Sequence, residues 1–131
     1  MKFDNIEIFK YSTDGRSVNG SLYPTEEITD KYEKVINTVK QEIINGKVIF
    51  GFIENTPVNI KTIAFILSSI EYSEEKIVIS IDTTDTEEGK ILSKLLKTAN
   101  YNNFSFNTVP DINNSNVNSI NFIKIGFKNK I

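Results

Sequence analysis

Three carboxylates follow two apolar runs of the sequence, and they are the residues best placed to do chemistry. Glu54 follows residues 47–53 (KVIFGFI), and Asp82 and Asp85 follow residues 76–81 (KIVISI). Each run is typical of a strand that is covered on both faces, as in a parallel sheet. If the two strands are neighbours joined by a helical crossover, their carboxyl ends lie roughly 5 to 10 Å apart. Carboxylate oxygens at that spacing suit a Mg²⁺ ion, so Glu54, Asp82 and Asp85 form a candidate metal site.

Residues 47–97 resemble a Toprim domain. The segment 77–97 (IVISIDTTDTEEGKILSKLLK) is similar to the second half of that domain, in which a strand ends in an aspartate pair and is followed by a glycine and an amphipathic helix. The resemblance implies that Asp82 and Asp85 hold Mg²⁺ and that Glu54 acts in acid–base chemistry. It also implies a phosphoryl-transfer or nucleic-acid-processing activity.

The same residues also fit a structural role. Residues 85–88 have the spacing of a capping box, and acidic side chains in the first turn of a helix stabilise its positive N-terminus by about 0.3 to 1 kcal/mol each. Asp82 would then only end a strand. The sequence leaves the metal site and the helix cap as alternatives.

Acidic side chains are concentrated between residues 71 and 88, whereas the charged residues after Asp111 are all lysines. The acidic set consists of Glu71, Glu74, Glu75, Asp82, Asp85, Glu87 and Glu88. An acidic face attracts a basic partner and raises the rate of association. We therefore expect a non-catalytic binding protein, an accessory or inhibitory factor that engages a basic protein partner through this face. An ordinary solvated surface is the alternative.

Composition limits the chemistry further. The chain has 131 residues, of which 39% are apolar and 24% are charged, as expected for one globular domain over residues 1–131. It has no histidine and no cysteine, which excludes Ser-His-Asp triads, thiol nucleophiles and the usual zinc sites. A net charge of −2 argues against direct binding to nucleic acid. The binding protein would need no cofactor, and the enzyme alternative would need Mg²⁺.

Residue usage gives a hint of source and location. One arginine stands among 15 basic residues, which is typical of AT-rich codons in low-GC bacteria and their phages and plasmids. The N-terminus lacks the apolar core of a signal peptide, and the apolar residues 58–70 are too few to span a bilayer. We expect a cytoplasmic protein that does not enter a membrane.

Apolar spacing predicts helices over residues 28–44, 57–70 and 87–99, and strands over 5–11, 47–53, 76–81, 104–109 and 120–127. This alternation predicts a single layered α/β domain with three helices and a mixed sheet of about five strands, parallel at its centre and antiparallel at its edges. The middle helix is apolar nearly all round, which indicates burial or a homo-oligomer interface. In residues 120–127 the alternation of apolar and polar residues is interrupted between Phe122 and Ile123, which are both apolar, and this interruption predicts a β-bulge.

Overall fold

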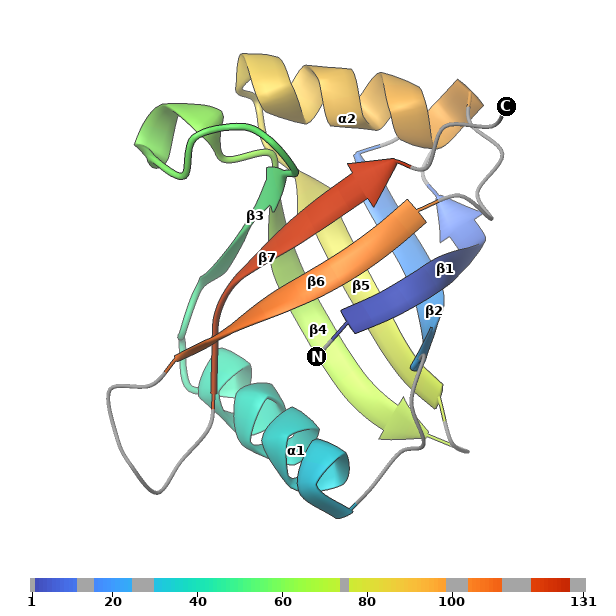
Figure 1. Cartoon of the computed structure of the whole chain (residues 1–131), viewed down its shortest axis with the longest axis vertical. Coiled ribbons are helices and arrows are strands. Elements are labelled where there is room, and N and C mark those ends of the chain that lie inside the picture. Colours follow the sequence, from blue (N-terminus) through green and yellow to red (C-terminus); the bar gives the residue numbers. More distant parts are fainter. Residues whose placement is uncertain are drawn as a thin grey trace.

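A computed structural model describes residues 2–11, 16–24, 30–73, 76–98, 104–111 and 119–127. Their strands close into a barrel (Figure 1). Around the barrel the order is β1 (Lys2–Tyr11), β2 (Ser17–Pro24), β5 (Lys76–Thr83), β4 (Phe65–Ser73), β3 (Ile49–Ile53), β7 (Ser119–Phe127) and β6 (Phe104–Asp111), and β6 pairs with β1. Closure leaves no unpaired strand edge in this part of the chain.

The strand directions differ from those expected. β3 and β7 are parallel, and every other neighbouring pair in the barrel is antiparallel. The predicted combination of helices with a single mixed sheet is confirmed, but the described residues form seven strands and two α-helices instead of about five strands and three helices, and the parallel part of the sheet is the single pair β3 and β7. The antiparallel neighbours β1 and β2, and likewise β4 and β5, are consecutive in the chain, so short connections can join them without helical crossovers.

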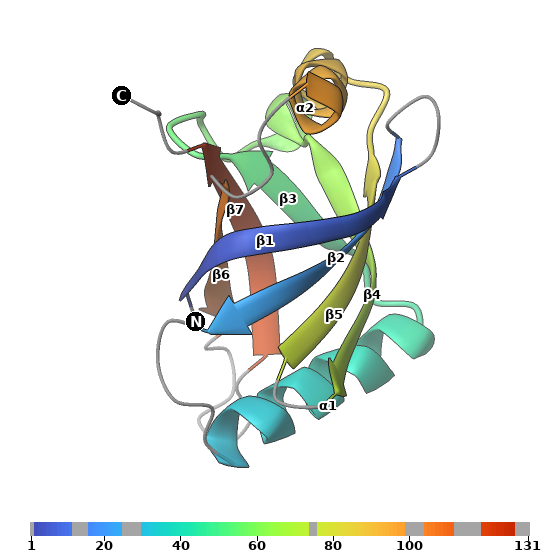
Figure 2. The ribbon, with the colours of Figure 1, turned by 90° about the vertical axis from the view of Figure 1, so that its right-hand side faces the viewer.

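Two helices cover opposite ends of the barrel (Figure 2). They are α1 (Asp30–Ile44) and α2 (Glu87–Thr98). α1 buries Ile36 and Val39, and α2 buries Leu92 and Leu96, so each helix turns one apolar stripe toward the barrel interior. Gly46 follows α1 with a φ of 102°, the left-handed conformation in which a glycine often ends a helix. No helix among the described residues is long and apolar enough to cross a membrane.

The predicted middle helix is wrong. Residues 57–70 form a loop with a short 3-10 turn, Ile60–Thr62, and then enter β4. Asn59 caps the turn, because its side chain accepts a hydrogen bond from the Lys61 amide (2.9 Å). The apolar residues beyond the turn are mainly β-branched or aromatic and fit a strand better than a helix. Since Phe65, Leu67 and Ile70 point into the barrel, the apolar excess of this segment no longer argues for an oligomer interface.

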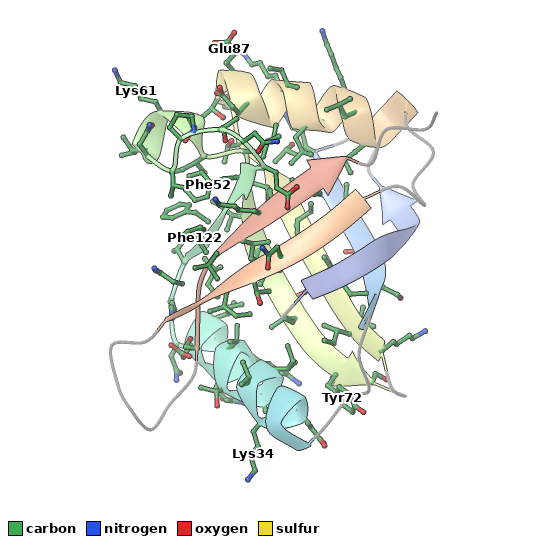
Figure 3. All side chains as sticks on the ribbon, in the orientation of Figure 1. Lys34, Phe52, Lys61, Tyr72, Glu87 and Phe122 are labelled. Atoms are coloured by element: carbon green, nitrogen blue, oxygen red, sulfur yellow. The ribbon has the colours of Figure 1, made fainter. Side chains whose placement is uncertain are left out.

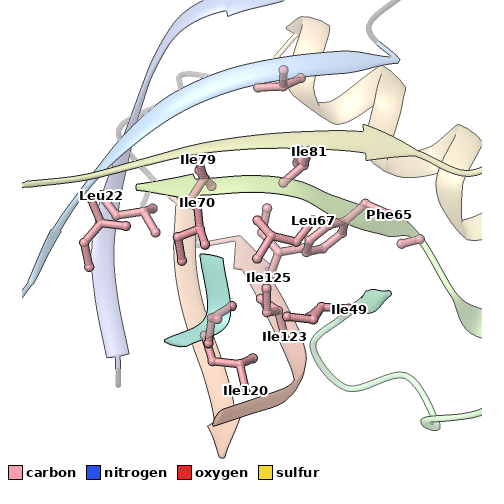
Figure 4. Close-up of a cluster of buried hydrophobic side chains, with 14 of the residues drawn as sticks. Leu22, Ile49, Phe65, Leu67, Ile70, Ile79, Ile81, Ile120, Ile123 and Ile125 are labelled. Carbon is pink, nitrogen blue, oxygen red and sulfur yellow. The ribbon is translucent and has the colours of Figure 1, made fainter. Parts of the chain in front are cut away.

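The core fills the barrel interior with aliphatic side chains from most strands (Figure 4). Phe65 is the largest of the fully buried side chains. Its ring lies against Gly51 on the neighbouring strand β3, and a Cβ atom at position 51 would overlap that ring. Glycine therefore makes room for the aromatic ring inside the barrel wall.

The predicted bulge is present in β7 and lies at Asn121. Val109 of β6 pairs with Phe122, whereas the next residue of β6, Pro110, pairs with Ile120. Asn121 is therefore the extra residue, and Ile120 and Ile123 both turn into the core.

Candidate functional site

The candidate metal ligands lie at the end of the barrel that α2 covers. β4 is antiparallel to both β3 and β5, so β3 and β5 run in the same direction with β4 between them. Glu54 follows β3 and Asp82 lies near the end of β5, so the two residues belong to strands that are two spacings apart, roughly 10 Å, and not to neighbouring strands as expected. No group of three carboxylates close enough to hold a metal ion occurs among the described residues, which include Glu54, Asp82 and Asp85.

Asp82 and Asp85 each have a partner within the chain. Ser17 Oγ donates a hydrogen bond to Asp82 Oδ1 (2.8 Å). Arg16 Nη2 lies 2.5 Å from Asp85 Oδ1, and both side chains of this ion pair are more than half exposed. The pair ties the residue before β2 to the segment before α2, so the two aspartates serve here as contacts between elements.

The acidic set does not form one face. Glu71 lies near the α1 end of β4, where Lys40 Nζ is 3.3 Å from its Oε1. Ile66 of the same strand pairs with Asp82, which places Glu71 roughly 15 Å along the barrel from Asp82. Glu74 and Glu75 lie outside the described residues. Asp82, Asp85, Glu87 and Glu88 remain together at the α2 end.

Two threonine hydroxyls fasten this acidic turn to the loop before β4. Thr84 Oγ1 and Thr86 Oγ1 both donate to the Ile63 carbonyl, at 2.8 and 2.5 Å. Thr86 Oγ1 also accepts from the Gly89 amide (3.0 Å), so Thr86 caps α2, and not Asp85 as the capping-box spacing predicted. Glu87 and Glu88 in the first turn are consequently held beside the 3-10 turn.

That loop carries apolar side chains to the surface. Ile60 is 81% exposed, the largest exposure of a big apolar residue in the described part of the chain, and Val58 is 45% exposed. Figure 3 shows the loop next to the first turn of α2, with Lys61 and Glu87 marking the two segments. We call Val58, Ile60, Glu87 and Glu88 the loop–helix ridge.

Sequence reasoning missed the apolar half of the loop–helix ridge. The sequence predicts Val58 and Ile60 in a helix that is either buried or at a homo-oligomer interface, whereas in the structure Asn59 and Thr62 form the capping box of a 3-10 turn. A signal was available in the spacing of Asn59 and Thr62, which is that of a capping box. A cap at Asn59 marks the start of a new helical turn, so it argues against one continuous helix over residues 57–70.

A serine hydroxyl can act as a nucleophile when a general base accepts its proton. The hydrogen-bond partners of Ser80 and Ser119 show whether either hydroxyl has such a base. Ser80 Oγ donates to Asn19 Oδ1 (2.5 Å), an amide oxygen that cannot serve as a general base at neutral pH. Ser119 Oγ donates to Glu42 Oε1 (2.6 Å) and accepts from Lys47 Nζ (2.9 Å). Ser119 is only 6% exposed, so this group joins α1 to β7 and offers little access to a substrate.

No protein-family model matches the chain, and no curated protein matches it. Among solved structures, the chain is similar to the bacteriophage T4 capsid assembly protease gp21, with a TM-score of 0.51 and 11% sequence identity. The match covers 97% of this chain and 90% of that chain. The two proteins therefore share a fold over nearly their whole lengths, and at this identity the likeness extends to the fold alone.

Proposed function

We propose that the protein is a non-catalytic binding protein, an accessory or inhibitory factor that engages a basic protein partner through the loop–helix ridge. The observation that carries this proposal is the pair of hydrogen bonds from Thr84 and Thr86 to the Ile63 carbonyl. They hold an apolar loop and an acidic helix turn side by side on one surface. A partner with an apolar contact residue and flanking lysines or arginines would complement that surface.

The ridge has the composition of a small binding surface. Val58 and Ile60 supply exposed apolar area, which lowers the free energy of association when a partner covers it. Glu87 and Glu88 lie at the edge of this area, where charges steer a partner of opposite sign and set the orientation of docking. Asp82 and Asp85 extend the negative potential, although each already has a partner within the chain.

Several features support binding in place of catalysis. The chain contains neither histidine nor cysteine, and the Ser80 hydroxyl is bonded to an amide instead of a base. Because the neighbour that shares this fold is a phage capsid assembly protein, we extend the proposal to a phage-encoded factor in particle assembly, although the neighbour is itself a protease. In this role the barrel would serve as a scaffold for contacts with other protein subunits.

Charge-reversed variants test the proposal with a control at the other end of the barrel. The double variant Glu87→Lys/Glu88→Lys reverses the ridge, and Glu71→Lys reverses an acidic residue near α1. We expect the wild-type chain and Glu71→Lys, expressed in the source cells, to retain the same bound protein, and the double variant to lose it. Equal retention by all three chains, measured by quantitative mass spectrometry, would exclude the ridge as the binding surface.

A further inference from the structure

The sequence contains two Asn-Gly dipeptides, and the fold places them in opposite environments. Asn19-Gly20 lies inside β2, whereas Asn45-Gly46 follows the last residue of α1. We propose that Asn45 is a site of spontaneous deamidation in the folded protein and that the barrel protects Asn19 from the same reaction. This modification site lies at the α1 end of the molecule and is independent of the proposed binding function.

The reaction needs only the two residues of the dipeptide and water. The main-chain nitrogen of the glycine attacks Cγ of the asparagine side chain and forms a C–N bond. The side-chain nitrogen leaves as ammonia, with the proton that the attacking amide gives up. Water then opens the resulting succinimide ring at either carbonyl, which gives aspartate or isoaspartate. Glycine favours the attack because it has no Cβ atom to hinder the approach of its nitrogen.

The structure leaves Asn45 and Gly46 open to solvent. Both residues are exposed, and a Cβ atom built on Gly46 would meet no heavy atom within 4 Å apart from its neighbours in the chain. Glycine adopts the φ of 102° found at this position without strain. Space for the succinimide ring and access for water are therefore both present at the end of α1.

The Gly46 amide has to leave one hydrogen bond before its nitrogen can attack. It donates to the Ile43 carbonyl (3.0 Å), and the Lys47 amide donates to the Glu42 carbonyl (2.8 Å), which is the pattern of a Schellman motif. Helix ends fray, so bonds of the last turn open at a small cost in free energy. The reactive state of Asn45 is therefore reached by local opening, while the barrel stays folded.

Asn19-Gly20 cannot open in the same way. Gly20 is buried, and it pairs with Ile8 of β1 on one side and with Ile79 of β5 on the other. The Asn19 side chain also accepts a hydrogen bond from Ser80 Oγ (2.5 Å). Ring closure at this dipeptide requires β2 to separate from its neighbours, and the free energy of that opening approaches the free energy of global unfolding.

Deamidation of Asn45 would change the contacts at the α1 end. It places a negative charge at the C-terminus of α1, where the helix dipole disfavours an anion. An isoaspartate also lengthens the main chain between Glu42 and Lys47, which form an ion pair (3.0 Å) and both bond to Ser119. The modified chain should therefore hold α1 less firmly against β7.

Ageing of the full chain at slightly alkaline pH, followed by peptic digestion in acid and mass spectrometry, tests the proposal. In the folded chain we expect the peptide with Asn45 to convert from amide to acid at least roughly tenfold faster than the peptide with Asn19, because each rate follows the population of its open state. In urea both dipeptides are unfolded, so the two rates should converge. Isoaspartate at position 45 would identify the succinimide route.

The variant Asn45→Gln is the matched control. Its longer side chain closes a ring far more slowly, so conversion of that peptide should disappear while the circular dichroism spectrum stays that of the wild type. Comparable rates at positions 19 and 45 in the folded chain would overturn the proposal. Conversion of Asn45 in urea but not in the folded chain would also overturn it, since the end of α1 would then protect the dipeptide.

Discussion

Thr86 Oγ1 lies 2.5 Å from the Ile63 carbonyl and donates a hydrogen bond to it, across a sequence separation of 23 residues. The same hydroxyl accepts from the Gly89 amide, so one side chain both caps α2 and fastens the loop before β4. This contact holds the loop that carries the exposed Val58 and Ile60 next to the first turn of α2 (Figure 3). The proposed binding surface therefore depends on a threonine that does not itself need to touch a partner.

Replacing Thr86 should show its double role. Thr86→Ala removes the cap and the hydrogen bond to Ile63, and we expect the free energy of unfolding to fall by about 1 to 2 kcal/mol. Thr86→Ser keeps the hydroxyl and should lose less than about 0.5 kcal/mol. Urea denaturation monitored by circular dichroism measures both. Equal losses for the two variants would show that the methyl group, and not the hydroxyl, is the stabilising element.

Gly51 should tolerate no side chain while Phe65 faces it. Gly51→Ala is expected to lower the free energy of unfolding by about 1 to 3 kcal/mol, because the added methyl group overlaps the aromatic ring. In the double variant Gly51→Ala/Phe65→Leu the overlap is relieved, so the combined loss should be smaller than the sum of the two single losses. Strictly additive losses in thermal denaturation would contradict the described packing.

The partly buried group formed by Ser119, Glu42 and Lys47 should stabilise the contact between α1 and β7. Ser119→Ala removes a hydroxyl that bonds to both charged side chains, and we expect a loss of about 1 kcal/mol. Ser69→Ala on the exposed surface of β4 serves as the control and should change stability by less than about 0.5 kcal/mol. A double-mutant cycle of Ser119→Ala with Lys47→Met should reveal coupling, and its absence would show that the three groups act independently.

Local patterns predicted the two helices well. The apolar spacing that predicts a helix over residues 28–44 corresponds to α1. The acidic turn at residues 87–88 and the apolar residues after it correspond to α2. In both helices the information is local, because one apolar stripe and one cap decide where the helix lies.

The barrel could not be predicted in the same way. Residues 65–70 pack alternate side chains inward until a bulge at Ser68 shifts the register, and this interruption hides the period of a strand. Closure depends on the pairing of Lys2 with Asn107, more than a hundred residues apart, and no local pattern encodes it. The adjacency expected for the candidate metal ligands was wrong for a related reason, because β4 lies between β3 and β5 where the alternating pattern predicted neighbouring strands.

Site-specific photo-crosslinking tests the central claim, the binding of a protein partner at the loop–helix ridge, most directly. A photoreactive amino acid replaces Ile60 on the ridge or, as the control, Lys34 on the exposed surface of α1 near the opposite end of the barrel (Figure 3). The proposed function predicts a crosslinked basic protein from position 60, none from position 34, and loss of the product from position 60 in the Glu87→Lys/Glu88→Lys background. The same product from both positions, or a product from position 60 that survives charge reversal, would contradict it.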